Sequence, residues 1–499
     1  MKKDFRKNYF ESVVSLGQRD KELHIKNILD RERLANFQVK TELLDYDYSK
    51  QRITKKALIE LLKIPEEINL SGSIKKIFSG GDLNLTEDRK VSHILHRGSH
   101  EGVKTRDLDK ISESTNQLMG FIKKMQLNRE HPIKKVISIG IGGSRLGTQL
   151  LSEAFSDIDS LIKVHYCSSY DLIELDNIIS VCKPLNTLII ISSKSFSTPE
   201  VLDNAKKAIS WLKSSGSKDP LNNLIGISSN KQRMIDYGIK ESHQFNILDS
   251  IGGRFSIWSS FSLPAIIDIG EKNFAEFKEG ASLADQHFLQ TKWKKNIPVL
   301  MALLNLWNMN ALGITNLGIF TYDYRARSVP KYLSQMMMES NGKSFTPENE
   351  KTPFKTCPLV WGGYGPDSQH SVFQWLLQGS YYSACDFIGI KTNGSDKSNS
   401  YQMLLAQVAA LSVGEKDKED NFKSIEGNNP ISLLKLKEFS PKSLGFLLAC
   451  YEHKVFVESC IYGINAFDQW GVQLGKKLTL KSKIEKNFMK DLFDNEFLS

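Results

Sequence analysis

VISIGIGGSRLG, residues 136–147, is the stretch that decides the fold of this chain. It starts as a nearly continuous apolar, β-branched run and ends in a glycine-rich turn that leads into a helical pattern. A second stretch of the same kind, TLIIISSKSFST, occupies residues 187–198. Short apolar runs followed by Gly- or Ser/Thr-rich turns and then helices are typical of buried parallel strands with crossover helices.

Further strand candidates extend this pattern in both directions. Residues 161–167 and 223–228 fit the same alternation, which predicts a doubly wound α/β unit over about residues 105–270. Residues 317–322 and 358–363 read as strand ends that feed polar loops, and they predict a second α/β unit. Residues 8–62 are polar with apolar positions at helical spacing, so we expect a helical start.

Composition describes an ordinary folded protein. Of the 499 residues, 40% are hydrophobic and 25% are charged, which excludes disordered and collagen-like chains. The formal charge of +9 is spread along the chain. The lysine-rich stretch from Lys476 to Lys490 is interleaved with acidic residues, so we interpret it as a solvated helix face and expect no nucleic-acid partner. A mild positive balance favours an anionic substrate.

The cysteines and the apolar segments indicate a cytoplasmic location. The six cysteines form no CxxC pair and no metal-ligand spacing, as expected of reduced thiols. No apolar core follows the charged residues 1–10, so we expect no signal peptide. The longest apolar candidate, residues 443–466, is interrupted by charged residues, so we expect no membrane span.

The first candidate site is the glycine-rich turn at residues 140–147. Where side chains are missing, backbone N–H groups can approach an anion at the positive end of the following helix. A dinucleotide site would need the GxGxxG pattern with glycine at position 145, where Arg145 stands. We interpret the turn as a phosphate loop, with a dinucleotide site and a structural tight turn as the open alternatives.

The second candidate is the run SSKSFST at residues 192–198, again between a strand and a helical pattern. Its hydroxyls and Lys194 supply several donors to a phosphate, and the helix dipole adds attraction. The alternative is a well-capped helix, because Thr198 and Pro199 suit the N-cap and first helical positions. One cap needs only one hydroxyl, so anion binding is the favoured interpretation.

Acid–base candidates lie further along the chain. Glu339 stands between three methionines and a turn, where partial burial of a carboxylate raises its pKa toward working pH. A capping or surface glutamate is the alternative. His370 follows a glycine-rich loop that could hold it within reach of a substrate.

His93, His96 and His100 have helical spacing, but no further ligand completes a metal site.

Several long motifs occur in a fixed order along the chain. They are residues 84–89 with His93, 140–147, 193–198, 252–259, 332–343, 361–363, 369–370, 451–457 and 467–476. Together they resemble the phosphoglucose isomerase family. The resemblance implies two sugar-isomerase (SIS) type α/β/α sandwich domains with mainly parallel sheets, plus helical N- and C-terminal segments. It places a small domain, residues 105–270, inside a large one formed by residues 1–104 and 271–499.

The resemblance also implies an activity, the interconversion of glucose 6-phosphate and fructose 6-phosphate without any cofactor or metal. Glu339 would move the proton between C2 and C1, and Arg254 would face the enediolate. His370 and Lys476 would help to open the sugar ring. Substrate would be bound by Gly143, Ser144, Ser193, Lys194, Ser195, Thr198, Gln335 and Gln469.

The same resemblance implies a homodimer with a shared active site, in which the histidine comes from the neighbouring subunit. Two other functions remain open at this point. A non-catalytic sugar-phosphate sensor would have lost Glu339, His370 or Lys476, but all three are present. A nucleotide-dependent oxidoreductase would use the 140–147 turn for its cofactor.

Overall fold

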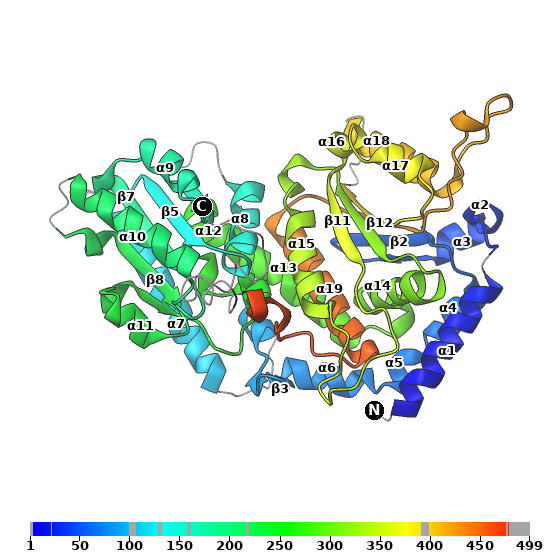
Figure 1. Ribbon diagram of the computed structural model, residues 1–499, viewed down its shortest axis with the longest axis horizontal. Helices are drawn as coiled ribbons and strands as arrows, with labels where there is room; N and C mark the ends of the chain where they lie inside the picture. Colours follow the sequence, from blue (N-terminus) through cyan, green and yellow to red (C-terminus); the bar gives the residue numbers. More distant parts are fainter. Residues whose placement is uncertain are drawn as a thin grey trace, which may run out of the picture.

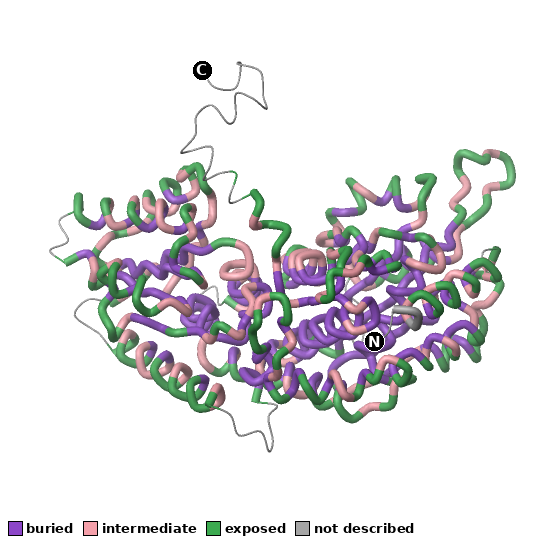
Figure 2. Tube along the Cα trace, turned by 60° about the horizontal axis from the view of Figure 1, so that its bottom comes forward, coloured by how far each residue is buried: buried purple, intermediate pink, exposed green. Residues whose placement is uncertain are grey.

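The computed structural model describes residues 3–20, 22–98, 106–127, 132–156, 161–215, 219–390, 399–475 and 478. Two sheets lie side by side along the long axis of the molecule, and helices cover them (Figure 1). Buried residues fill the interior around each sheet, and exposed residues line the outer helices (Figure 2). The protein is therefore an α/β protein built on two sheets.

In chain order, the helices are α1 (Lys3–Arg19), α2 (Ile25–Ile28), α3 (Arg31–Asn36), α4 (Lys55–Leu61), α5 (Ile64–Glu67), α6 (Leu70–Phe78), α7 (Arg106–Leu127), α8 (Gly143–Phe155), α9 (Ile173–Ser180), α10 (Pro199–Ser214), α11 (Lys231–Asp236), α12 (Leu263–Ile269), α13 (Glu271–Gln290), α14 (Ile297–Leu306), α15 (Val329–Asn341), α16 (Gly365–Gln369), α17 (Phe373–Gln378), α18 (Asn399–Val413) and α19 (Pro441–Tyr462). None of the helices in these described ranges is long and apolar enough to cross a membrane.

The five-stranded sheet has the order β6-β5-β7-β8-β9, and all its pairs are parallel. Its strands are β5 (Lys135–Gly140), β6 (Lys163–Cys167), β7 (Thr187–Ser192), β8 (Leu224–Ser228) and β9 (Gln244–Asn246). The first four agree with the strands expected from the sequence. In this order the chain reverses direction across the sheet between β5 and β7, and α/β proteins bind ligands at such a switch point.

Alternate side chains of these strands pack on opposite faces of the sheet. Ile137 and Ile189 pack with α9, α10 and α11 in one buried cluster. Val136 and Leu188, each one residue earlier, pack with α7 and α8 on the other face. Because both faces are covered, the strands read as continuous apolar runs instead of alternating ones.

The six-stranded sheet has the order β1-β2-β13-β12-β10-β11. Its strands are β1 (Gln38–Lys40), β2 (Leu44–Lys50), β10 (Asn316–Thr321), β11 (Leu359–Tyr364), β12 (Ala384–Ile390) and β13 (Ile431–Leu436). The last four run parallel, whereas β1 and β2 join antiparallel at one edge. The two remaining strands, β3 (Asp82–Asn84) and β4 (Arg89–Lys90), form a separate hairpin.

The expectation of a purely helical start is wrong at β1 and β2. The sequence of β2, LDYDYSK, contains acidic residues that argue against a buried strand. Distant lysines contribute to the compensation of these charges: Lys437 lies 2.6 Å from Asp45, and Lys435 lies 3.7 Å from Asp47. Asp47 also has a local partner, Lys50, at 3.1 Å. Lys435 lies in β13 and Lys437 follows it, so these two contacts exist only where β2 pairs with β13.

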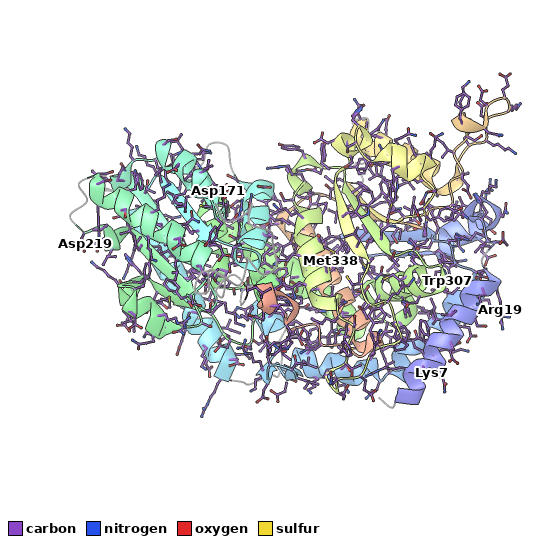
Figure 3. The ribbon with its side chains drawn as sticks, viewed as in Figure 1. Lys7, Arg19, Asp171, Asp219, Trp307 and Met338 are labelled. Carbon is purple, nitrogen blue, oxygen red and sulfur yellow. The ribbon has the colours of Figure 1, made fainter. Side chains whose placement is uncertain are left out.

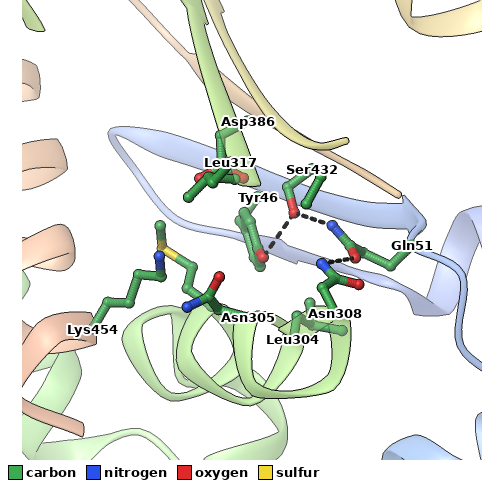
Figure 4. Close-up of a pocket in the computed structure, with 11 residues that line it drawn as sticks. Tyr46, Gln51, Leu304, Asn305, Asn308, Leu317, Asp386, Ser432 and Lys454 are labelled. Carbon is green, nitrogen blue, oxygen red and sulfur yellow. Dashed lines mark hydrogen bonds between the residues drawn. The ribbon is translucent and has the colours of Figure 1, made fainter. Parts of the chain in front are cut away.

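A hydrogen-bonded series of buried polar groups joins β2 to β13 and to η8 (Trp307–Ala311), the π-helical turn that follows α14 (Figure 4). Ser432 Oγ lies 3.1 Å from Tyr46 Oη and accepts a hydrogen bond from Gln51 Nε2 at 2.9 Å. Asn308 Nδ2 donates to Gln51 Oε1 at 3.1 Å. The cavity that they line measures about 10 Å³. A cavity of this volume holds about one water molecule, so it is too small to bind a sugar phosphate.

We propose the domain boundaries already inferred from the sequence. The five-stranded sheet uses strands between residues 135 and 246, which fall inside the proposed small domain of residues 105–270. The six-stranded sheet uses strands from before residue 51 and after residue 315, which fall in the proposed large domain of 1–104 and 271–499. This nesting supports a small domain inserted into a large one.

The long helices α13 and α19 pack closely at two glycines. A Cβ on Gly280 would lie 1.8 Å from Lys442 O, and one on Gly445 would lie 1.9 Å from Phe277 O. Both distances are too short for a non-bonded contact, so a side chain fits at neither position. The backbones of the two helices therefore lie in direct contact at these points. Helix α19 is buried on nearly all sides, as expected of a central core helix.

Gly445→Ala therefore should lower the free energy of unfolding by about 1–3 kcal/mol, the usual cost of overpacking a core. Urea denaturation measures this change. The matched control is Gly120→Ala in α7, where no atom of the described chain lies within 4 Å of the added Cβ. That substitution should stabilise the helix by about 0.5–1 kcal/mol. Equal stability of the two variants would contradict the close helix contact.

Candidate active site

The two candidate phosphate loops meet at the switch point of the five-stranded sheet. Gly140 at the end of β5 pairs with Ser192 at the end of β7. The loops that follow these residues therefore emerge side by side at the carboxyl edge of the sheet. This is where Gly143, Ser144, Ser193, Lys194, Ser195 and Thr198, six of the predicted substrate-binding residues, are located.

The first loop needs its glycines because it touches another backbone segment. Gly142 has φ 56° and ψ −126°, a conformation that L side chains rarely adopt. A Cβ on Gly143 would lie 2.2 Å from the carbonyl carbon of Gly253. Ser144 follows in the first turn of α8, with its N–H bonded to Ile141 O at 3.2 Å. The loop is thus held against the segment that carries Arg254.

The second loop directs hydroxyl groups toward one another. Ser193 Oγ lies 3.1 Å from Thr198 Oγ1, and Ser197 Oγ donates to Ser195 Oγ at 2.8 Å. Thr198 occupies the N-cap position of α10, but its side chain makes no capping hydrogen bond. The simple helix-cap interpretation therefore does not account for this hydroxyl, and the 16-residue helix α10 presents its N-terminus to the loop.

Lys194 connects the second loop to the segment before Arg254. Its Nζ donates to the carbonyl oxygens of Asp249 at 2.8 Å and of Ile251 at 2.9 Å. Burial, together with the positive charge of the neighbouring Arg89, lowers the pKa of the Lys194 ammonium to about 8. A positive charge held at this edge attracts an anion, and an arriving anion would in turn stabilise the protonated lysine.

Arg254 lies at the centre of a polar cluster that it forms with Ser340, Glu339 and Gln469. It belongs to the 3₁₀ helix η5 (Gly253–Trp258) and is 2% exposed. Its Nε donates to Ser340 Oγ at 2.6 Å, and its Nη1 lies 3.3 Å from Glu339 Oε1. The same Nη1 lies 3.4 Å from Gln469 Oε1. Burial lowers the pKa of Arg254, and the carboxylate of Glu339 acts in the opposite direction.

Glu339 and Gln335 project from one face of α15. They are four residues apart, and Gln335 Nε2 donates to Glu339 Oε2 at 2.9 Å. Both carboxylate oxygens of Glu339 therefore have a partner, yet its side chain remains 21% exposed. Met338, which precedes Glu339, marks this part of α15 in Figure 3. The carboxylate is held in position and still open to a ligand.

Gln335 also reaches the first phosphate loop. A Cβ on Gly142 would lie 3.1 Å from Gln335 Nε2. The other amide atom, Gln335 Oε1, is buried and has no hydrogen-bond partner in the described residues. A buried acceptor without a partner is costly. This oxygen is therefore suited to accept a hydrogen bond from a ligand hydroxyl.

Two predicted catalytic residues are not part of this cluster. His370 follows α16 and is exposed, and its ring forms no hydrogen bond or ion pair with the residues that the structure describes. Lys476 lies outside the described residues. Of the remaining predicted residues, Gln335 contacts Glu339 and Gln469 contacts Arg254, and the other substrate-binding residues lie on the two neighbouring loops.

A buried ionic network lies behind η5. Arg97, from η1 (His93–Arg97), bonds to Asp285 on α13 at 2.8 Å and to Glu452 on α19. Trp258, at the end of η5, donates from Nε1 to Glu452 Oε1 at 2.9 Å and receives the Arg97 guanidinium over its ring at 4.4 Å. These contacts fix the segment that carries Arg254 to the core helices.

Two of the three histidines considered for a metal site, His93 and His96, are buried in the protein. His93 stacks on Phe255 with ring centroids 4.8 Å apart, and burial lowers its pKa well below the usual value. His96 is buried as well, whereas His100 lies outside the described residues. The described part of the chain contains no group of three His, Cys, Asp or Glu side chains that is placed to hold a metal ion.

Sequence reasoning assigned no role to several residues around the segment that carries Gln469. Thr86 donates to Asp468, and Asn465 Nδ2 donates to Thr86 Oγ1 at 2.8 Å. Lys343 Nζ donates to Asn465 O at 2.6 Å. Thr86 and Lys343 do stand in two of the family motifs, but only the folded chain brings these motifs together.

Comparisons with known proteins agree with this arrangement. The family model described as phosphoglucose isomerase matches residues 47–497. A glucose-6-phosphate isomerase of Acinetobacter baumannii is 37% identical over 93% of this chain and 90% of its own length. One from Hydrogenovibrio crunogenus is 35% identical over 95% and 94%. The crystal structure of a glucose-6-phosphate isomerase from Chlamydia trachomatis has a TM-score of 0.88 at 28% identity and covers 97% of this chain and 99% of its own.

Fold and family are thus established together. The family model covers most of the chain, and the curated relatives align with it over nearly its whole length. The predicted α/β fold of the sugar-isomerase type is confirmed by the Chlamydia trachomatis structure. This chain belongs to the phosphoglucose isomerase family.

Proposed function

We propose that this protein interconverts D-glucose 6-phosphate and D-fructose 6-phosphate by moving a proton between C2 and C1 through a cis-enediolate. The observation that carries the proposal is the carboxylate of Glu339. It lies 3.3 Å from a buried arginine and 2.9 Å from a glutamine amide, and it is still partly exposed. Two hydroxyl- and glycine-rich loops lie close by at the switch point.

Glu339 is the proposed base. A carboxylate that removes a proton from C2 and returns it to C1 must stay in place while its charge changes. The hydrogen bonds from Gln335 and Arg254 provide this restraint. A positioned acid or base contributes about 10²- to 10⁴-fold to a proton transfer.

Arg254 is the proposed partner of the enediolate. When the proton leaves C2, negative charge develops on the oxygens of the enediolate. A fixed positive charge stabilises it there. The Arg254 guanidinium is buried and bonded to Ser340, Ala466 and Asp468. It therefore needs little rearrangement when the charge develops, which is the basis of electrostatic preorganisation.

The two loops are the proposed phosphate site, formed by Ser144, Ser193, Lys194, Ser195 and Thr198 with the backbone of Gly143. Loop hydroxyls, the ammonium of Lys194 and the N-termini of α8 and α10 all favour an anion. The phosphate is remote from the reacting carbons, so its binding energy serves to orient them. Gln335 and Gln469 would bond the sugar hydroxyls.

Ring opening is assigned to His370 and Lys476. A cyclic sugar exposes its carbonyl only after an acid and a base act on the ring oxygen and the anomeric hydroxyl. Because His370 is exposed and without a partner in its own described chain, we propose that it acts in the active site of a second subunit. The protein is accordingly proposed to be a homodimer with shared active sites.

The cellular setting is part of the proposal. All six cysteines are free thiols, as is typical of a reducing compartment. We infer a cytoplasmic enzyme that acts in glycolysis and gluconeogenesis. The proton transfer is internal to the sugar, so it requires neither a nucleotide nor a metal ion.

The first test is the isomerase reaction in deuterated water, followed by NMR with fructose 6-phosphate alone. Glucose 6-phosphate with deuterium at C2 is expected, because the shuttled proton exchanges with solvent at the enediolate. Glu339→Gln should lower kcat by about 10²- to 10⁴-fold with little change in KM. Glu419→Gln, on an exposed loop, is the matched control. Substrate binding without any exchange would favour the sugar-phosphate sensor.

A second test uses the pKa of Lys194. The ammonium is charged below about pH 8 and loses its proton as the pH rises through that value, so kcat/KM should fall above about pH 8. Lys343 has a similar pKa, and the variant Lys194→Arg separates the two. Arginine stays charged, so the fall should become shallower, because only the ionisation of Lys343 then contributes to it. Coinciding profiles of the wild type and Lys194→Arg would exclude Lys194 as the titrating group.

A third test examines the shared active site. Glu339→Gln and His370→Ala homodimers should each be nearly inactive. When the two are mixed, unfolded and refolded together, heterodimers should contain one intact site, and about a quarter of wild-type activity should return. Refolding each variant alone is the control. Without recovery in the mixture, His370 would belong to the site of its own subunit.

A further inference from the structure

Residues 465–470 connect the end of α19 to the active site. In Figure 1 this segment lies in red between the two sheets. Arg254 Nη2 donates to the carbonyl oxygens of Ala466 and Asp468, and Gln469 Oε1 lies 3.4 Å from Arg254 Nη1. The segment therefore forms one wall around the buried guanidinium, and its position sets that of Gln469.

Lys343 binds this segment from the other side. Its Nζ donates to Asn465 O at 2.6 Å and lies 3.1 Å from Asp468 Oδ1. It also donates to Ser340 O at 2.6 Å, at the carboxyl end of α15 next to Glu339. One ammonium thus uses its three donors to connect the helix that carries Glu339 with the segment that carries Gln469.

The second carboxylate oxygen of Asp468 is also occupied. Thr86 donates its hydroxyl to Asp468 Oδ2, and Trp470 Nε1 donates to Thr86 Oγ1 at 3.3 Å. Asp468 is 4% exposed, so loss of the Lys343 ammonium would leave a buried carboxylate without its ion-pair partner. Such a loss is expected to displace the segment, because an unpaired buried charge is strongly unfavourable.

The surroundings of Lys343 indicate a restraint and not a solvent-facing charge. The Lys343 side chain is 17% exposed. Its pKa is lowered to about 8, chiefly by burial and by the charge of Arg254, while the carboxylates of Asp468 and Glu339 act in the opposite direction. Lys343 therefore lies among the charged groups of the site, while its ammonium group contacts the protein atoms Ser340 O, Asn465 O and Asp468 Oδ1.

We propose that Lys343 is a positioning residue for the isomerisation: it fixes the 465–470 segment to the end of α15 and so holds Gln469 and Arg254 in register with Glu339. This inference rests on the proposed function. It assigns a role to a residue that touches no reacting atom and acts through the segment.

The test compares Lys343→Met with the wild type. Methionine fills similar space but has no donors. A displacement of about 1 Å in an active site can cost about 10²-fold, so kcat should fall about 10- to 100-fold while KM changes little. Lys351→Met, an exposed lysine of the same loop, is the matched control and should keep full activity.

A spectroscopic measurement reports the position of the segment itself. The seven tryptophans are labelled with 5-fluorotryptophan, and the ¹⁹F resonance of Trp470 is assigned with Trp470→Phe. Lys343→Met should shift this resonance and leave that of Trp293, which bonds to the distant Glu66, unchanged. Asp468→Asn removes the same ion pair and should shift the Trp470 resonance too, which provides a second variant if Lys343→Met fails to fold.

Two results would overturn the inference. One is unchanged kcat in Lys343→Met, and the other is lowered kcat with an unchanged Trp470 resonance. A wild-type protein without isomerase activity would refute the proposed function, and with it the catalytic part of this inference. The Trp470 resonance would still show whether Lys343 holds the segment, so the two failures are distinguishable.

Discussion

The buried guanidinium of Arg254 is the group on which the rest of the site depends. A charge this deep is tolerated only when its donors are bonded and a countercharge is near. Ser340, Ala466, Asp468 and Glu339 meet that demand. These partners come from α15 and from the segment after α19. The hydrogen bonds and the ion pair of one arginine therefore join parts of the chain that are distant in sequence.

Close backbone contact links this centre to the phosphate loops. Gly143 and Gly253 approach so closely that no side chain fits between them. The loop that follows β5 therefore lies directly against the backbone of the segment that carries Arg254. A phosphate bound at the switch point and a carboxylate on α15 would then share one rigid frame, as a reaction that depends on orientation requires.

Much of the five-stranded sheet could be predicted from the sequence because its signals are local. The runs before Gly140 and Ser193 identify β5 and β7, and the turns after them identify the candidate phosphate loops. Strand β2 could not be predicted in this way, since the countercharge of Asp45 and part of that of Asp47 come from Lys437 and Lys435 at the other end of the chain. Lys343 was missed for the same reason, because its partners Asn465 and Asp468 lie far along the sequence.

The sequence by itself determined the α/β class, the family motifs and the chemical types of the candidate residues. These follow from residue type, short-range periodicity and motif order. The tertiary structure alone decided which motifs meet. It brought Glu339, Arg254 and Gln469 within hydrogen-bonding distance, left His370 exposed and apart, and placed Lys343 between two segments. The physical reason is that buried charges and close backbone contacts are satisfied by groups distant in sequence, which no local pattern encodes.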